Sequence, residues 1–195
     1  MPGGAPKPEV ERVAAVILAG GQGSRMGGAD KGLIEYQGRP LIEWILMTLT
    51  PQVDELVISA NRNLERYAGY GHRVLPDTLP DYPGPLAGIL AALQTVRADW
   101  LVVTPCDTPR LPSDLVARLL DSARHAQVPL AVAADASRMH PTCFVIRTDQ
   151  CDELAACLAR GERAVRRWQA TIPSVSVRFD AACLVNVNHP EDLRS

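Results

Sequence analysis

The stretch Val13-Ala-Ala-Val-Ile-Leu18 runs directly into Ala19-Gly-Gly-Gln-Gly-Ser-Arg-Met-Gly-Gly28, and Lys31 follows three residues later. The unbroken apolar run predicts a buried strand, and the glycines behind it predict a tight loop. Such a loop exposes backbone N–H groups, and Arg25 and Lys31 add positive charge beside them. The stretch therefore predicts a loop that binds the phosphates of a nucleotide, the alternative being a glycine-rich turn without a ligand.

Two common phosphate-binding loops do not fit this spacing. A Walker A loop needs Gly-Lys-Ser/Thr, whereas Lys31 stands between Asp30 and Gly32. The dinucleotide fingerprint G-x-G-x-x-G has Met26 at its third glycine position. It also expects an acidic residue after the second strand, where this chain has Asn61. The two departures from the dinucleotide fingerprint, Met26 and Asn61, weaken the case for a nicotinamide cofactor.

Apolar runs and amphipathic stretches alternate along the chain, which predicts an α/β domain with a mostly parallel central sheet flanked by helices. A helix is expected over Leu41–Leu49, opened by Pro40 and stopped by Pro51, and another begins at Ser113. The expected strands span residues 13–19, 55–60, 72–75, 100–104, 129–134, 141–147 and 174–179. We expect one domain over residues 13–195, preceded by a flexible leader over residues 1–12.

The composition limits which partners the protein can bind and indicates the cellular compartment in which it works. The net charge of −2 argues against a nucleic-acid partner, because proteins that bind nucleic acids carry an excess of basic residues. No apolar run approaches the roughly 18 residues of a membrane span. The five cysteines include no C-x-x-C pair, which favours reduced thiols in the cytoplasm over disulfides or a zinc site.

Asp107 follows the expected strand 100–104, within the turn Pro105-Cys-Asp-Thr-Pro109. The carboxyl ends of parallel strands meet at one edge of a sheet, so this carboxylate should face the glycine loop across a shared cleft. A lone carboxylate beside phosphates suits Mg²⁺. The alternative is an aspartate that caps the following turn or helix.

Three further strand or turn ends carry residues of interest, each with a plainer alternative. Asn61 can donate to and accept from a ligand, or it can serve as a turn residue. Asp77 can orient a base or a ribose, or cap its own turn. Gly84 and Gly88 bracket a helix start whose N–H groups can approach a flat base, although Pro-Gly-Pro is also an ordinary turn.

Taken together, these motifs resemble those of the molybdenum cofactor guanylyltransferases, over about residues 13–193. The motifs that carry the resemblance are the glycine loop with Asp30-Lys31, Asn61-Arg62, Asp77, Asp81-Tyr-Pro-Gly-Pro-Leu-Ala-Gly88, Cys106-Asp-Thr-Pro109 and Asn186-Val-Asn-His-Pro-Glu191. The resemblance implies the three-layer, Rossmann-like fold of the nucleotidyltransferases. It also implies Mg²⁺-dependent transfer of GMP from GTP to molybdenum-loaded molybdopterin.

The resemblance carries site residues over to this sequence. It implies catalytic roles for Arg25, Lys31 and Asp107, with Asp107 as the Mg²⁺ ligand, and it marks Gly28 as needed for activity. The implied nucleotide contacts are Leu18, Ala19, Gly20, Gly21, Lys31, Asn61, Asp77, Gly88 and Asp107. Related cytidylyltransferases tend to have Leu-Ala-Ala-Gly in the first loop, so Gly20 leaves room for a purine.

The resemblance places the pterin substrate at Arg163, Asn186 and Asn188, although Arg163 also suits a solvated helix face. Many relatives in the wider group have an aspartate where Asn188 stands, so we expect a metal site with one carboxylate. The implied protein partners are a molybdenum-insertion protein and apo-molybdoenzymes, in transient contact. Two other functions stay open: a nucleotidyltransferase for CTP or a sugar phosphate, and a non-catalytic carrier of nucleotide or molybdopterin.

Overall fold

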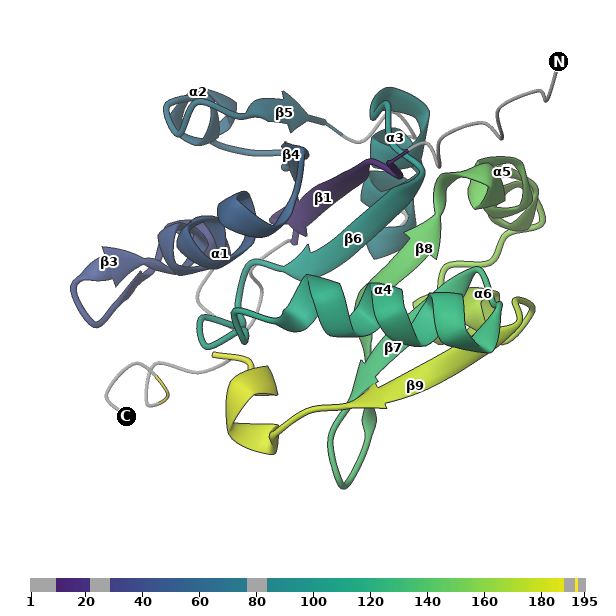
Figure 1. Cartoon of the computed structure of the whole chain (residues 1–195). Coiled ribbons are helices and arrows are strands. Elements are labelled where there is room, and N and C mark those ends of the chain that lie inside the picture. The colour runs from purple at the N-terminus through teal and green to yellow at the C-terminus, as the bar shows by residue number, and fades with distance from the viewer. Residues whose placement is uncertain (1–9, 22–28, 77–83, 188–191, 193–195) are drawn as a thin grey trace, which may run out of the picture.

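The computed structural model describes residues 10–21, 29–76, 84–187 and 192. Within these residues the chain forms a seven-stranded sheet in the order β5-β4-β1-β6-β8-β7-β9 (Figure 1). The strands are β1 Val13–Leu18, β4 Glu55–Ser59, β5 Arg73–Leu75, β6 Trp100–Pro105, β7 Leu130–Ala134, β8 Met139–Arg147 and β9 Ser174–Arg178. Strand β8 is antiparallel to its neighbours β6 and β7, whereas the other pairings in this sheet are parallel.

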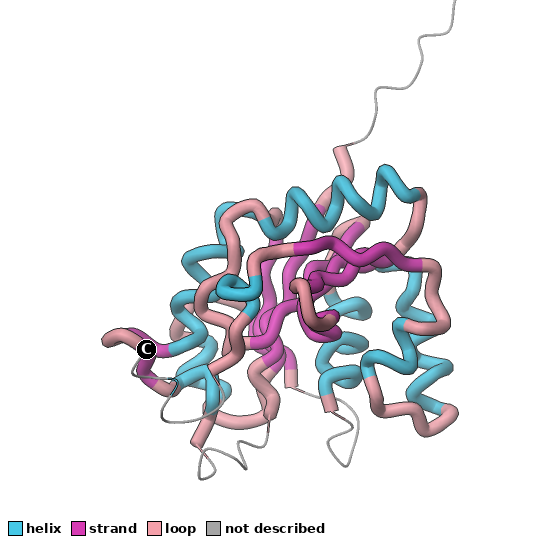
Figure 2. Tube along the Cα trace, turned by 90° about the horizontal axis from the view of Figure 1, so that it is seen from below, coloured by secondary structure: helices cyan, strands magenta, loops and turns pink. Residues whose placement is uncertain are grey.

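Helices cover both faces of this sheet, which gives three layers (Figure 2). In Figure 1, α4 crosses in front of the sheet, and α3 lies behind it. The helices are α1 Leu41–Leu49, α2 Leu64–Ala68, α3 Pro85–Thr95, α4 Leu115–Ala126, α5 Cys151–Ala159 and α6 Val165–Gln169. The predicted α/β class with a mostly parallel, helix-flanked sheet is confirmed.

The central strand β1 shows why the opening apolar run has no polar alternation. Ala15 and Ile17 join the core formed with α1 and α4, whereas Ala14 and Val16 join the core formed with α3, α5 and α6. Successive side chains of a strand point to opposite faces, so a strand covered on both sides must be apolar throughout.

The expected strands are all found, each within two residues of its predicted bounds. A small hairpin was not predicted: β2 Glu35–Tyr36 pairs with β3 Arg39–Pro40. Gln37 and Gly38 turn this hairpin with positive φ values of 50° and 79°. Pro40, expected in the first helical turn, instead ends β3 and forms the N-cap of α1.

The segment expected as a leader is described only at its end. Glu11 accepts hydrogen bonds from Trp100 Nε1 at 3.1 Å and Arg124 Nε at 3.0 Å. The backbone N–H of Arg12 donates to Asp99 Oδ2 at 2.8 Å. These contacts attach Glu11 and Arg12 to the amino ends of the sheet, and residues 1–9 lie outside the described residues.

Gly88 lets α3 pack tightly on β4. A Cβ atom at this position would lie 2.2 Å from Ser59 Oγ, 3.0 Å from Ser59 Cβ and 3.3 Å from Leu18 Cδ2. Real Cβ atoms do not come so close to other heavy atoms, so α3 would have to move away from the strands. The glycine therefore sets the distance between α3 and the edge of the sheet where β1 and β4 end.

We expect Gly88→Ala to lower the free energy of unfolding by about 1–3 kcal/mol, because it overpacks this contact. Urea unfolding would measure the change. The control is Gly21→Ala, since a Cβ there meets nothing within 4 Å. Introducing Gly88→Ala into a Ser59→Gly background should cost less than in the wild type, and equal costs in both backgrounds would contradict the packing argument.

Candidate functional site

The carboxyl ends of β1, β4, β5 and β6 meet at one edge of the sheet. The Ala19 N–H donates to the Ser59 carbonyl at 2.8 Å, and the Ala60 N–H donates to the Leu75 carbonyl at 3.0 Å. The Cys106 N–H donates to the Leu18 carbonyl at 3.1 Å. These bonds continue the ladder past the strand ends, so the segments that follow the four strands start side by side, as predicted.

Lys31 and Asp107 form an ion pair across this edge. Lys31 begins a short 3₁₀ helix, Lys31–Leu33, and its Nζ lies 2.5 Å from Asp107 Oδ2. The side chains are 22% and 10% exposed, so water screens the pair only in part. The structure thereby brings together the predicted cation from the glycine-loop side and the predicted carboxylate from β6.

The second carboxylate oxygen of Asp107 faces a different situation. Asp107 Oδ1 is buried and has no hydrogen-bond partner among the described residues. A buried carboxylate oxygen without a partner is costly, because it has lost its water and gained nothing in return. This oxygen is therefore suited to bind a cation. An aspartate that only capped a turn would need no cation there.

Gly20 and Asn61 lie against each other where β1 and β4 end. A Cβ at position 20 would stand 3.0 Å from Asn61 Nδ2, tighter than an ordinary van der Waals contact. An alanine at position 20 would push the Asn61 amide away from the loop. The two predicted nucleotide-binding residues are thus brought together, and Gly20 is what permits their close approach.

The C-terminal segment returns to the same edge. The Val187 N–H donates to the Asp107 carbonyl at 2.8 Å, and Thr108 Oγ1 donates to Asn186 Oδ1 at 3.2 Å. Asn186, predicted to lie at the pterin side, is therefore held one residue from the Lys31–Asp107 pair. Of the three residues predicted for the pterin, only Asn186 is seen beside the Lys31–Asp107 pair in the described part of the chain, and its contact with the pterin stays a prediction.

Arg163 makes its described contacts with the chain itself. Its guanidinium Nη1 donates to the Leu158 carbonyl at 2.9 Å, at the end of α5, and to the Glu162 carbonyl at 2.8 Å. The residue precedes α6 and so does not lie on a helix face. Its backbone oxygen is 3.8 Å from where a Cβ of Gly84 would be, which places it near the start of α3.

Several predicted positions lie outside the described residues. These are Arg25, Gly28, Asp77 and Asn188. Leu18, Ala19, Gly20 and Gly21 are described, and they form the end of β1 and the start of the loop. The described contacts of Gly88 are those of the α3–β4 packing, and its contact with a nucleotide stays a prediction.

Arg62 belongs to the site although sequence reasoning gave it no role of its own. Its Nη2 donates to the Gly21 carbonyl at 3.1 Å and reaches the Ala29 carbonyl at 3.5 Å. The guanidinium thereby links the two described ends of the glycine loop. Its position directly after Asn61, at a strand exit, is the signal by which the sequence could have marked it.

Asp30 and Tyr67 form a second pair that sequence reasoning missed. The Tyr67 hydroxyl donates to Asp30 Oδ1, and Asn63 Nδ2 donates to Asp30 Oδ2 at 2.9 Å. Tyr67 lies in α2, and nothing in the sequence marks its hydroxyl as a partner of the loop. Only the packing of α2 beside the 3₁₀ helix brings the two together.

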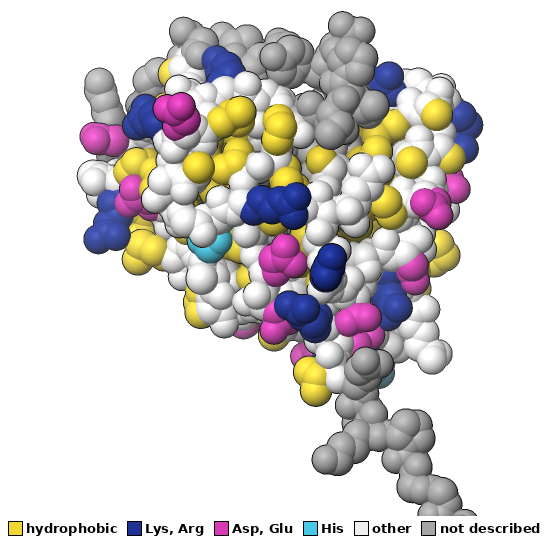
Figure 3. Space-filling model, turned by 90° about the horizontal axis from the view of Figure 1, so that it is seen from above, with side chains coloured by type: hydrophobic (Ala, Val, Ile, Leu, Met, Phe, Trp, Pro, Cys, Tyr) yellow, Lys and Arg dark blue, Asp and Glu magenta, His cyan; other side chains and the backbone are white. Residues whose placement is uncertain are grey.

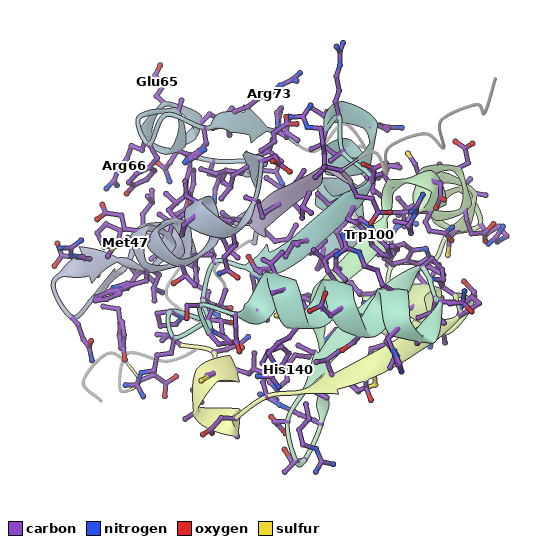
Figure 4. The ribbon with its side chains drawn as sticks, viewed as in Figure 1. Met47, Glu65, Arg66, Arg73, Trp100 and His140 are labelled. Carbon is purple, nitrogen blue, oxygen red and sulfur yellow. The ribbon has the colours of Figure 1, made fainter. Side chains whose placement is uncertain are left out.

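His140 has a structural partner in the β7–β8 hairpin, where it is labelled in Figure 4. Its Nε2 lies 2.7 Å from Asp135 Oδ2. Hydrogen bonds from Ser137 and His140 hold the pKa of Asp135 well below its usual range. The contact stabilises the hairpin, so this histidine has a structural role.

Other chemistry is sparse in the described part of the chain. No cluster of three or more His, Cys, Asp or Glu side chains suited to a metal occurs there, and no described helix is long and apolar enough to cross a membrane. Burial raises the pKa of the Cys143 thiol to about 12, and burial also raises that of Cys106. Neither thiol is thus a ready nucleophile. Figure 3 shows one face, on which cationic and anionic side chains are interspersed.

Known proteins share both the sequence and the fold. The profile of the MobA-like NTP transferase domain matches residues 15–175. A molybdenum cofactor guanylyltransferase from Burkholderia cenocepacia (strain HI2424) is 46% identical over 199 residues, covering 96% of this chain and 97% of the relative. One from Shewanella halifaxensis (strain HAW-EB4) is 43% identical over 182 residues, covering 92% and 91%.

Solved structures agree on the fold. Molybdopterin-guanine dinucleotide biosynthesis protein A from Archaeoglobus fulgidus superimposes with a TM-score of 0.76 at 22% identity, covering 93% of this chain and 95% of that one. A CMP:2-keto-3-deoxy-manno-octonic acid synthetase complexed with CTP gives 0.77 at 17% identity, covering 94% and 95%. The profile match and the sequence relatives together establish that this chain belongs to the molybdenum cofactor guanylyltransferases, within the MobA-like NTP transferase family.

Proposed function

We propose that this protein transfers GMP from GTP to the terminal phosphate of molybdenum-loaded molybdopterin, releasing pyrophosphate. The observation that carries the proposal is the Lys31–Asp107 pair at the edge where four strands end, with Asp107 Oδ1 buried and without a hydrogen-bond partner among the described residues. A cation and a carboxylate that lacks one ligand are what a polyphosphate and its metal ion require. The choice of guanine as the base and of the molybdenum cofactor as the acceptor follows from the relatives, which are molybdenum cofactor guanylyltransferases.

The reaction is a direct displacement. One oxygen of the acceptor phosphate forms a bond to the α-phosphorus of GTP, while the bond from that phosphorus to the pyrophosphate oxygen breaks. The acceptor phosphate is already ionised at neutral pH, so no side chain has to remove a proton. The protein contributes position and charge: Lys31 would neutralise phosphate oxygens, and we propose the same role for Arg25, which lies outside the described residues.

Asp107 is the residue that would hold Mg²⁺ in this site. Its unpartnered Oδ1 fits the oxygen ligands that this ion prefers, and its Oδ2 is paired with Lys31. When bound, Mg²⁺ supplies positive charge against the phosphate oxygens and the leaving pyrophosphate. Lys31 adds a positive charge beside the same carboxylate, where the negative charge of the phosphates would gather.

Gly20 and Asn61 are the residues that we propose to lie beside the base of the nucleotide. Asn61 offers both a donor and an acceptor, which suits the edge of a base. Gly20 lets that amide lie against the loop, with 3.0 Å between Asn61 Nδ2 and the position a Cβ would take. We propose that guanine lies along this pair.

The free, buried thiols of Cys106 and Cys143 fit a reducing compartment, and we propose that the reaction takes place in the cytoplasm.

Pyrophosphate release is the first test of this function. With Mg²⁺ and molybdenum-loaded molybdopterin, we expect release from GTP well above that from CTP or ATP, and we expect it to depend on the acceptor. The comparison without acceptor serves as the control. A preference for CTP would overturn the choice of base, and no release with any nucleotide would favour the carrier function.

Replacing the proposed metal ligand tests the site. Asp107→Asn removes the charge while keeping the shape, and we expect it to lower kcat by at least about a hundredfold, as the loss of one electrostatic contact to a transition state does. The apparent Mg²⁺ requirement should rise in the same titration. Asp121→Asn is the matched control, because Asp121 is 78% exposed on α4. Unchanged turnover in Asp107→Asn would contradict the assignment.

The pterin side can be tested separately from the nucleotide side. We expect Asn186→Ala to raise the KM for molybdenum-loaded molybdopterin by roughly tenfold, the effect of one lost hydrogen bond to a charged group, and to leave the KM for GTP unchanged. Thr108→Val is the control, since it removes only the Thr108–Asn186 hydrogen bond. If Asn186→Ala changed the KM for GTP alone, Asn186 would belong to the nucleotide half.

A further inference from the structure

We propose that Tyr67 is a positioning residue for the transfer: its hydroxyl fixes Asp30, and Asp30 fixes the start of the short helix that carries Lys31. The inference rests on the proposed function, in which Lys31 holds the phosphates. Tyr67 acts through these two residues and is not itself placed against the reacting atoms. Four features of the described structure support this role.

First, both carboxylate oxygens of Asp30 are held by one neighbouring segment. Tyr67, in α2, donates its hydroxyl to Oδ1, and Asn63, at the N-cap of α2, donates its amide to Oδ2 at 2.9 Å. A carboxylate that receives a donor on each oxygen cannot rotate without losing one of them. Asp30 is therefore fixed in orientation as well as in place.

Second, Asp30 starts the turn that carries Lys31. It is the N-cap residue of Lys31–Leu33, and its carbonyl accepts the Leu33 N–H at 3.0 Å. Lys31 is the next residue, and its side chain reaches Asp107 Oδ2 at 2.5 Å. The backbone position of Lys31 sets the region that its flexible side chain can reach, so a shift of this turn would move the ammonium group relative to Asp107.

Third, the turn closes over the Tyr67 hydroxyl. A Cβ atom on Gly32 would lie 2.6 Å from the Tyr67 oxygen and 3.4 Å from two ring carbons. The chain thus passes directly over the hydroxyl, with no room for a side chain between them. The hydroxyl is held from Asp30 on one side and covered by Gly32 on the other.

Fourth, Tyr67 is itself immobile. Its side chain is 0% exposed, and it belongs to the core built around α1 and α4. Burial and the bond to Asp30 raise the pKa of the phenol well above its usual range, so it remains a donor throughout the working pH range. A donor anchored in the core can hold a residue of an adjoining loop in one position.

The test is Tyr67→Phe, which removes the hydroxyl and keeps the ring. Tyr70→Phe is the matched control: it removes the hydroxyl of a neighbouring, partly buried tyrosine whose partner is Glu43. We expect Tyr67→Phe to lower kcat/KM for GTP by roughly ten- to a hundredfold, the scale of a misplaced catalytic group. Tyr70→Phe should leave it within about twofold, and circular dichroism would confirm that both variants fold.

A second background separates positioning from general damage to the fold. In a Lys31→Met protein, Tyr67→Phe should have little further effect on the residual kcat/KM, because the residue through which it acts is gone. A loss as large as in the wild-type background would overturn the proposal. Asp30→Asn offers an independent route, since its amide oxygen can still accept the Tyr67 hydroxyl; we expect a smaller loss than with Tyr67→Phe, and an equal or larger loss would contradict the role given to the Tyr67 bond.

A readout without turnover keeps this inference distinct from the proposed function. Reductive ¹³C-methylation of the lysine amines, followed by NMR, reports the environment of Lys31 in the nucleotide-free protein. Tyr67→Phe should shift the Lys31 resonance toward that of an exposed lysine and raise its labelling rate, whereas Tyr70→Phe should change neither. If the wild type released no pyrophosphate but Tyr67→Phe still shifted the Lys31 resonance, the positioning of Lys31 by Tyr67 would stand and the proposed function would fail. An unchanged Lys31 resonance in Tyr67→Phe would overturn the positioning role.

Discussion

The ion pair between Lys31 and Asp107 is the contact on which the site depends. Its two residues are 76 positions apart in sequence, and the parallel arrangement of β1 and β6 is what brings them within 2.5 Å. A carboxylate this deeply buried is stable only with a cation beside it, and breaking such a pair from one side costs about 3–5 kcal/mol. The pair therefore couples the stability of this edge to the charge balance that a nucleotide and its metal ion would enter.

Small residues set the distances around that pair. Gly20 admits the Asn61 amide to the loop, Gly32 lets the chain pass over Tyr67, and Gly88 lets α3 lie against Ser59. Each of these glycines meets a different steric demand, and all three lie within or beside segments that the sequence marked for nucleotide contact. Packing and ligand binding thus place their demands on the same short stretches of chain.

Much of the fold was predictable because the sheet is covered on both faces. Strands such as Val13–Leu18 must then be apolar throughout, and such runs stand out from the amphipathic helices between them. The convergence of Lys31, Asn61 and Asp107 followed from the rule that parallel strands end at one edge. The β2–β3 hairpin was missed because its strands are two residues long and its turn uses Gln37, a poor marker of such turns. The roles of Asp30 and Tyr67 could not be predicted, because a single hydroxyl in a core helix finds its partner only through tertiary packing.

The return of the chain to Asp107 has a consequence for biosynthesis. The Val187 N–H bonds to the Asp107 carbonyl, and its side chain packs with Tyr36 and Leu41 beside the hairpin. Strands β1, β4, β5 and β6 can pair before residue 187 has left the ribosome, but the contacts of Val187 with Asp107 and the hairpin cannot form until then. The hydrogen bond from the Val187 N–H to the Asp107 carbonyl therefore forms late in synthesis, after the strands that flank Asp107 are complete.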